Sequence, residues 1–246
     1  MDKGSARTKI DLDPVSGADI LGNTLGGPAA VGLIAPRVHP TAHQLAQGAK
    51  RALDVGGAAC LLVLLSPLFL VIAALVSLDG GSVFYGHRRI GQGGRGFDCL
   101  KFRTMIPGAA ECLPEYLSYH PHANDEWRLS QKLDRDPRVT PVGAFLRRWS
   151  LDELPQLVNV LRGEMSLVGP RPVTRPEMTH YGPVASLYTA VVPGMTGLWQ
   201  VSGRSSLGYD RRVALDRAYI EGWSLRLDLR ILLATPRAVL RRCGAK

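Results

Sequence analysis

The sequence predicts an α+β fold that is mainly helical, with a small β-hairpin and one kinked re-entrant membrane helix. Three observations support this prediction. Residues 55–78 contain no charged side chain, and a helix of that length can cross a hydrocarbon core of roughly 30 Å. Two apolar runs flank a Gly-rich connection near residue 93, which is typical of a hairpin. Helix start and stop signals dominate the second half of the chain.

Composition limits the class of protein. The chain has 246 residues, of which 46% are hydrophobic, enough for one domain with a sizeable core. Its four cysteines show no CxxC or Cys/His ligand spacing, which excludes a disulfide scaffold and a zinc site. The net charge of +9 predicts an anionic partner, namely nucleic acid, a phosphorylated substrate or an anionic membrane surface.

Residues 1–49 differ from the rest of the chain. Their charges nearly cancel, they are rich in Gly, Ala and Pro, and they lack a sustained apolar period, so we expect a mostly disordered leader. No basic segment runs directly into an apolar one at the start, as a signal peptide requires. We therefore divide the chain into the leader 1–49, a membrane helix over 50–79 and a domain over 80–246.

The membrane helix carries its own break. Pro67 lacks a backbone N–H and clashes with the preceding turn, so it kinks the helix, and Ser66 can satisfy a freed carbonyl. Lys50 and Arg51 precede the segment and residues 87–89 follow it with more positive charge. The positive-inside rule places both ends on the cytoplasmic face, which a bent re-entrant segment allows and a straight span does not. A buried core helix is the alternative, but such a helix is rarely apolar on every face.

The hairpin and the polar region after it come next. Residues 82–90 and 97–105 form the predicted strands, and Lys101 and Arg103 share one face because they are two apart. The connecting GQGGRG lacks the lysine of a P-loop and receives no phosphate role. Residues 107–135 are polar and predict helix and loop.

Three helices are expected in the second half. Thr140-Pro141 begins one, residues 152–161 form another that ends at Gly163, and the chain from Tyr209 is largely helical. The last stretch combines a leucine stripe with basic residues, so it lies either on an anionic membrane surface or against the domain. The stripe consists of Leu225, Leu229, Leu232 and Leu233, and the basic residues are Arg226, Arg230, Arg237, Arg241 and Arg242.

The adjacent carboxylates Asp152 and Glu153 are the densest chemical signal. Ser150 and Glu153 fit a capping box, in which the acids merely offset a helix dipole. Pro155 would then delete a bond inside that helix, so a later start that frees Glu153 fits better. Carboxylates beside arginines can bind Mg²⁺ with substrate phosphates, and one of them can attack a diphosphate while the other holds the metal.

Two Gly- and Pro-rich segments supply further candidates. Prolines on both sides of Arg171 hold it on a stiff, non-helical backbone, which suits either aiming its guanidinium or bracing a loop. Residues 193–204 carry Trp199, Gln200 and Arg204. These side chains could stack on and hydrogen-bond a base or sugar, or form a structural turn around a core tryptophan.

Taken together, LLSPLF, FYGHRRIG, CLKFRTM, DPRVTPVGAFLRRWSLDELPQL, RGEMSLVGPRP and PGMTGLWQVSGR resemble the bacterial sugar transferases. These enzymes are the monotopic phosphoglycosyl transferases, or polyprenyl-phosphate hexose-1-phosphate transferases. The resemblance runs from about Lys50 to the C-terminus and is to the short, exopolysaccharide-priming form. It does not cover the leader.

The resemblance implies transfer of a hexose 1-phosphate from a UDP-sugar to undecaprenyl phosphate, with release of UMP. It implies Mg²⁺ and a covalent aspartyl-phosphosugar intermediate in a catalytic domain on the cytoplasmic face of the bacterial inner membrane, in contact with its lipid. Galactose is the expected sugar and glucose the alternative, while a homodimer is left open. A nucleic-acid binder is a competing class without any supporting motif, and a non-catalytic basic membrane scaffold is another.

The resemblance also assigns residues. Asp152 matches the nucleophile and Glu153 the metal-binding partner, and Arg147 and Arg171 match phosphate-binding arginines. Lys101, Arg103 and Asp216 fall in further motifs of the family with less defined roles in substrate binding. Ser66-Pro67 matches the break of the family's re-entrant helix.

Overall fold

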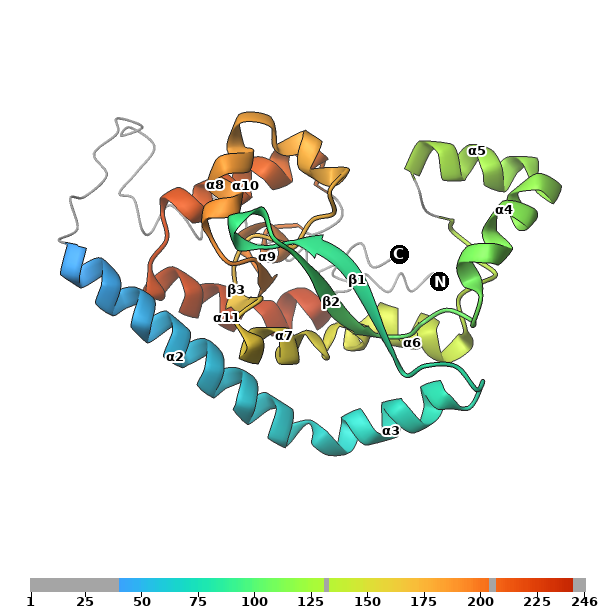
Figure 1. The fold of residues 1–246 in the computed structure, drawn as a ribbon, viewed down its shortest axis with the longest axis horizontal. Helices are drawn as coiled ribbons and strands as arrows, with labels where there is room; N and C mark the ends of the chain where they lie inside the picture. Colours follow the sequence, from blue (N-terminus) through green and yellow to red (C-terminus); the bar gives the residue numbers. More distant parts are fainter. Residues whose placement is uncertain (1–39, 131–132, 204–206, 241–246) are drawn as a thin grey trace, which may run out of the picture.

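A computed structural model of the chain describes residues 40–130, 133–203 and 207–240. Helices dominate, and two separate two-stranded sheets complete the fold, which confirms the α+β prediction (Figure 1). Residues 1–39, Arg204, Arg241 and Arg242 lie outside the described residues, so the predictions made for them stay predictions.

The long apolar segment forms two helices that meet at the predicted break. α2 spans Pro40–Leu64 and α3 spans Ser66–Ser77. No described helix alone is both long and apolar enough to cross a bilayer, but Gln44–Leu64 and Ser66–Ser77 together meet that test as a pair bent by 64°. Figure 1 shows this bent pair along the lower side of the molecule.

The chemistry of the break follows the sequence prediction. In a continuous helix the N–H of Pro67 would bond to the carbonyl of Val63, and proline has no N–H to give. The Ser66 hydroxyl donates to that same carbonyl over 2.8 Å instead. The freed acceptor therefore keeps a partner inside the chain, as an apolar environment demands.

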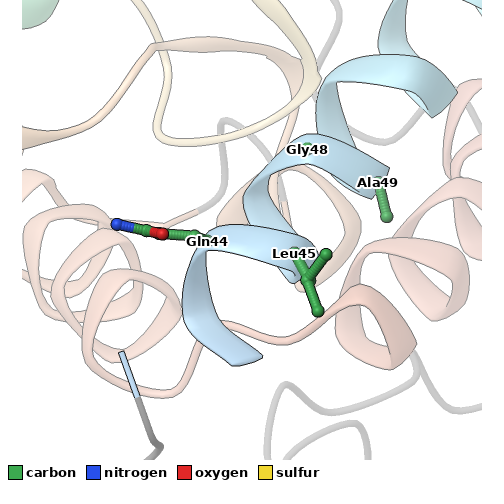
Figure 2. A pocket seen from close by; sticks show the side chains of 4 residues that line it. All are labelled: Gln44, Leu45, Gly48 and Ala49. Atoms are coloured by element: carbon green, nitrogen blue, oxygen red, sulfur yellow. The ribbon is translucent and has the colours of Figure 1, made fainter. Parts of the chain in front are cut away.

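α2 begins earlier than we expected. Residues 40–49 are helical, so the part of the leader next to residue 50 belongs to the helix instead of to a disordered segment. Its sequence, PTAHQLAQGA, contains mostly good helix formers. A hollow lined by Gln44, Leu45, Gly48 and Ala49 lies on these first turns (Figure 2) and contains none of the predicted site residues.

Polar contacts hold α2 to the rest of the domain. Lys50 donates to the carbonyl of Val168 over 2.9 Å and forms an ion pair with buried Asp228 over 2.8 Å. Further along, Asp54 is buried and accepts bonds from the hydroxyl of Ser166 and the N–H of Leu167. Lys50, which we expected to act as a flanking charge at the membrane, thus contacts the protein.

The predicted hairpin is present. β1 spans Phe84–Ile90 and β2 spans Gly96–Phe102, paired antiparallel with a short 3-10 turn, η1 (Gln92–Gly94), between them. Phe102 at the end of β2 is buried with Ile72 and Val76 of α3. α3 therefore packs directly against the strand that carries Lys101.

The polar region forms α4 (Ala109–Tyr119) and α5 (Pro121–Ser130), and then α6 (Pro141–Trp149) begins where predicted, with the Thr140 hydroxyl accepting the N–H of Gly143 over 2.9 Å. A Cβ on Gly143 would lie 2.0 Å from the carbonyl oxygen of Thr104, so only glycine lets α6 approach the end of the hairpin. This approach brings α6 and the residues after it next to β2.

The remaining elements build the core beside the hairpin. η2 (Leu151–Glu153) and α7 (Gln156–Arg162) lead to Gly163, whose φ of +81° ends α7 as predicted. β3 (Ser166–Val168) pairs parallel with β4 (Gly194–Thr196), a sheet that we did not predict. The other elements are η3 (Glu177–Val184), α8 (Ala185–Ala190), α9 (Leu198–Val201), α10 (Tyr209–Glu221) and α11 (Leu225–Leu240).

Candidate active site

The acidic pair lies on η2, a single 3-10 turn between α6 and α7. Ser150 ends α6 in the left-handed conformation, with a φ of +57°. The α-helix that follows begins only at Gln156, after Pro155, and the Ser150 side chain makes no capping bond to η2. The capping-box interpretation is therefore wrong, and the helix starts even later than the alternative placed it.

A lysine of the hairpin neutralises this pair. The ammonium of Lys101 on β2 lies 2.8 Å from Glu153 Oε1 and 3.5 Å from Asp152 Oδ2. The Asp152 side chain is only 9% exposed, whereas that of Glu153 is 38% exposed. One carboxylate thus faces the protein interior and its neighbour faces solvent.

The groups around Asp152 shift its pKa in opposite directions. Burial and then the neighbouring charge of Glu153 raise the pKa of Asp152, while the charges of Lys101 and Arg147 lower it, and the net shift is upward. Burial disfavours the charge of Lys101, but the two carboxylates outweigh it and raise the pKa of that ammonium. Burial and Glu153 therefore outweigh Lys101 and Arg147, which limit the rise in the pKa of Asp152 without reversing it.

Arg147 joins the pair as predicted. It stands in the last turn of α6, and its Nε donates to the Thr104 hydroxyl over 2.9 Å. Burial lowers the pKa of Arg147, and the charge of Asp152 opposes that shift. Thr104 follows β2 and orients the guanidinium toward the site, a contact that sequence reasoning missed.

Arg103 does not join the acidic pair. Its guanidinium forms two bonds with Asp79, just after α3, and also donates to the carbonyls of Ser82, Val76 and Met105. The hydrogen bonds to Arg103 lower the pKa of Asp79 to about 2. Arg103 thus attaches the end of α3 to the end of β2, and the substrate-binding role expected for it stays a prediction.

A cleft separate from the acidic pair contains one of the remaining candidates, Arg171. It is lined in part by Arg171, Tyr181 and Trp199, with the Arg171 guanidinium 5.7 Å from the centre of the Trp199 ring. Gln200 donates to the carbonyl of Met195 over 3.2 Å, and its Oε1 is buried without a hydrogen-bond partner among the described residues. Gln200 therefore braces this region with its amide N–H.

Asp216 lies beneath the cleft and is fully buried. Its Oδ2 accepts the hydroxyl of Tyr181 over 2.7 Å, whereas Oδ1 has no hydrogen-bond partner in the part of the chain that the structure describes. Burial raises the pKa of Asp216 to about 7, although Tyr181 and Arg171 act in the opposite direction. Asp216 supports the wall of the cleft through Tyr181.

The acidic pair suits Mg²⁺ only when a bound substrate supplies further ligands. Across the described residues, no group of three or more His, Cys, Asp or Glu side chains is placed to hold a metal ion. Mg²⁺ often binds one or two carboxylates and completes its shell with water and substrate phosphates. Asp152 and half-exposed Glu153 form such an incomplete set, so they suit a metal ion that arrives with a phosphorylated substrate.

Comparison with known proteins identifies the family. The family described as bacterial sugar transferase matches residues 45–242. The exopolysaccharide production protein ExoY of Rhizobium meliloti (strain 1021) is 56% identical over 198 residues, which cover 80% of this chain and 88% of that protein. The chain belongs to the bacterial sugar transferase family.

Two longer relatives define the reaction class. The UDP-galactose-lipid carrier transferase of Erwinia amylovora is 50% identical over 196 residues, and the undecaprenyl-phosphate galactose phosphotransferase of Salmonella typhimurium is 48% identical over 196 residues. Each match covers 80% of this chain and 41% of the relative. The chain is an enzyme, a phosphoglycosyl transferase.

The raised pKa of Asp216 predicts a pH-dependent stability. The folded protein keeps the proton of Asp216 up to about pH 7, whereas the unfolded chain releases it near pH 3.8. The contribution of Asp216 to the free energy of unfolding is therefore full below pH 3.8 and is lost as the pH rises through about 7. Asp216→Asn should remove this loss, worth on the order of a few kcal/mol.

Thermal unfolding from pH 5 to pH 8 in detergent measures the effect. We expect the midpoint of the wild type to fall more steeply with pH than that of Asp216→Asn. Asp210→Asn removes an exposed carboxylate from the same helix and should behave as the wild type does. An equally steep fall in Asp216→Asn would contradict the prediction.

Proposed function

We propose that the enzyme transfers a hexose 1-phosphate from a UDP-sugar to undecaprenyl phosphate and releases UMP, as the priming step of exopolysaccharide synthesis. One observation carries the proposal: the buried carboxylate of Asp152 lies within 3.5 Å of the Lys101 ammonium and beside Arg147. An anionic nucleophile surrounded by cations suits attack on a diphosphate, because the cations offset the charge of both partners.

The reaction proceeds in two displacements at one phosphorus atom. An oxygen of Asp152 attacks the sugar-bearing phosphorus of the donor, the bond to the bridging oxygen breaks, and UMP leaves with that oxygen. An oxygen of undecaprenyl phosphate then attacks the same phosphorus and breaks its bond to Asp152, which regenerates the carboxylate. Lys101 and Arg147 stabilise the negative charge on the transferred phosphoryl group in both steps.

Glu153 is the residue we assign to Mg²⁺, because it is the more exposed carboxylate of the pair and is turned toward solvent. When bound, the metal ion supplies Lewis-acid stabilisation of the phosphate oxygens. Lys101 bonds to Glu153 in the structure, so we expect this ammonium to shift toward the substrate phosphate when the site is filled.

The bent helix pair supports a re-entrant association with the cytoplasmic face of the inner membrane. Large apolar side chains are exposed around the break, with Val63 at 76%, Leu64 at 69% and Leu70 at 73%. On α11, Leu229 and Leu233 of the predicted stripe are also exposed, while Leu227 and Ile231 pack into the core. These surfaces suit lipid contact next to a site that needs both a soluble donor and a lipid phosphate.

A donor panel tests the function. The purified enzyme with undecaprenyl phosphate and Mg²⁺ should release UMP fastest from UDP-galactose, in line with the names of two relatives. UDP-glucose is the alternative donor, because it differs only in the orientation of one hydroxyl. Turnover confined to an N-acetylated sugar would contradict the hexose assignment, and no UMP release from any UDP-sugar would favour a non-catalytic scaffold.

The covalent step predicts a trapped adduct. With a donor labelled in the sugar and no lipid acceptor, the wild type should retain label on the protein, and Asp152→Asn should retain none because its amide cannot attack. Glu153→Gln should form the adduct at least about 10-fold more slowly and respond less to added Mg²⁺, since a metal-bound carboxylate is lost. A wild-type level of adduct in Asp152→Asn would remove this residue from the role of nucleophile.

The helix break at Ser66-Pro67 predicts on which side of the membrane the leader lies. In intact cells, a cysteine at Ser5 should resist a membrane-impermeant thiol reagent in the wild type, because a re-entrant helix keeps the leader in the cytoplasm. Ser66→Leu combined with Pro67→Ala should restore a straight helix and expose the leader. The background lacks Cys60, Cys99, Cys112 and Cys243.

A cysteine at exposed Ser118 serves as the control for this experiment, because the catalytic domain should stay protected in both proteins. Labelling of Ser5→Cys in the protein with Ser66 and Pro67 intact would show an ordinary span and overturn the re-entrant proposal.

A further inference from the structure

Two guanidinium groups lie against one indole ring. The Cζ of Arg171 is 5.7 Å from the centre of the Trp199 ring, and the Cζ of Arg212, in the first turn of α10, is 5.0 Å from it. Each cation is attracted to the π face, but both groups carry the same charge. Arg212 received no role from the sequence motifs.

These two arginines line the cleft that also contains Glu177, Tyr181 and Tyr209. Glu177 is the carboxylate among its lining residues, and it is already engaged, because Arg89 donates to it over 2.7 Å and the N–H of Thr174 over 2.7 Å. The charge of Glu177 is therefore largely balanced from outside the cleft. With Glu177 engaged in this way, the cleft presents two guanidinium groups, those of Arg171 and Arg212.

Arg212 is fixed for binding. Its Nε donates to the carbonyl of Leu207 over 3.0 Å, which orients the guanidinium plane, and the indole of Trp199 supports it. Arg171 stands on the backbone between Pro170 and Pro172. Its guanidinium makes no hydrogen bond or ion pair to another residue within the described ranges. Two oriented forks match the oxygens of one phosphate group.

The cleft is electrostatically connected to the acidic pair. The charge of Arg171 acts to lower the pKa of Lys101, the residue that bonds to Asp152 and Glu153. Cleft and pair therefore share one electrostatic environment, as two parts of a single donor site would. Figure 1 shows α10, the helix that carries Arg212, at the top of the molecule and α3 along its lower edge, so Arg212 lies on a part of the fold remote from α3.

We propose that Arg212, together with Arg171 beside the same Trp199 ring, binds the phosphate of the nucleotide half of the donor, the group that leaves as UMP. This inference rests on the proposed function and assigns a part of the substrate to a second cleft. The position away from α3 favours a soluble nucleotide over the lipid phosphate. While Asp152 attacks the sugar-bearing phosphate, Arg212 holds the leaving group and offsets the charge that develops on it.

The test compares Arg212→Gln with Arg211→Gln, which removes the same charge from an exposed neighbour on the same helix. UMP affinity is measured by calorimetry in an Asp152→Asn background, so the readout does not require turnover. Arg212→Gln should weaken UMP binding and raise the KM for the UDP-sugar by about tenfold or more, as expected for a lost charge-assisted hydrogen bond. Arg211→Gln should stay within about twofold of the parent protein.

The KM for undecaprenyl phosphate should not change in Arg212→Gln, and a rise confined to that KM would assign the cleft to the lipid and overturn the inference. If Arg212→Gln does not fold, Arg212→Lys replaces it, because it keeps the charge without the guanidinium fork. Arg212→Lys should weaken UMP binding about threefold, and an unchanged affinity for UMP overturns the inference. If Arg212→Gln turns over the UDP-sugar as the wild type does and binds UMP with unchanged affinity, the inference fails while the proposed function stands. A wild type that neither turns over UDP-sugars nor binds UMP contradicts the proposed function as well.

Discussion

The structure depends on one ion-pair arrangement, the single ammonium of Lys101 that bonds to two consecutive carboxylates. Burying Asp152 without a counter-charge would cost several kcal/mol or would protonate it. Lys101 can meet it only if β2 lies beside η2, and that placement requires Gly143 to let α6 approach Thr104. The register of the hairpin, the closeness of α6 and the electrostatic environment of Asp152 are therefore coupled.

The same strand connects the active site to the membrane segment. Two residues beyond Lys101, Arg103 binds Asp79 at the end of α3, and at the other end Lys50 of α2 binds Val168 and Asp228. Both arms of the bent pair are thus attached by polar bonds to strands that lead to the site. These directional bonds fix both arms of the bent pair relative to the domain that contains Asp152.

The sequence could predict features that depend on local chemistry. The break at Ser66-Pro67, the hairpin and the cap at Thr140 follow from single residues and their neighbours, and the structure contains all three. The β3–β4 sheet could not be predicted, because its three-residue strands are distant in the chain and show no period. The contact of Arg103 with Asp79 could not be predicted for a similar reason. The alternation of side chains along a strand predicts which face a residue lies on, but not which residue it contacts. Arg212 had one available signal, its position one turn before Asp216.

The 3-10 turn explains how two adjacent acids can have different roles. Consecutive residues in such a turn point about 120° apart, because three residues complete one revolution. Asp152 is therefore directed into the protein, where burial and fixed cations act on it, while Glu153 is directed toward solvent, where a hydrated metal ion can reach it. An α-helix starting at Ser150 would have placed Pro155 inside it and lost a hydrogen bond. The left-handed Ser150 and the late start of α7 avoid that loss and so create the turn that directs the carboxylates of Asp152 and Glu153 apart.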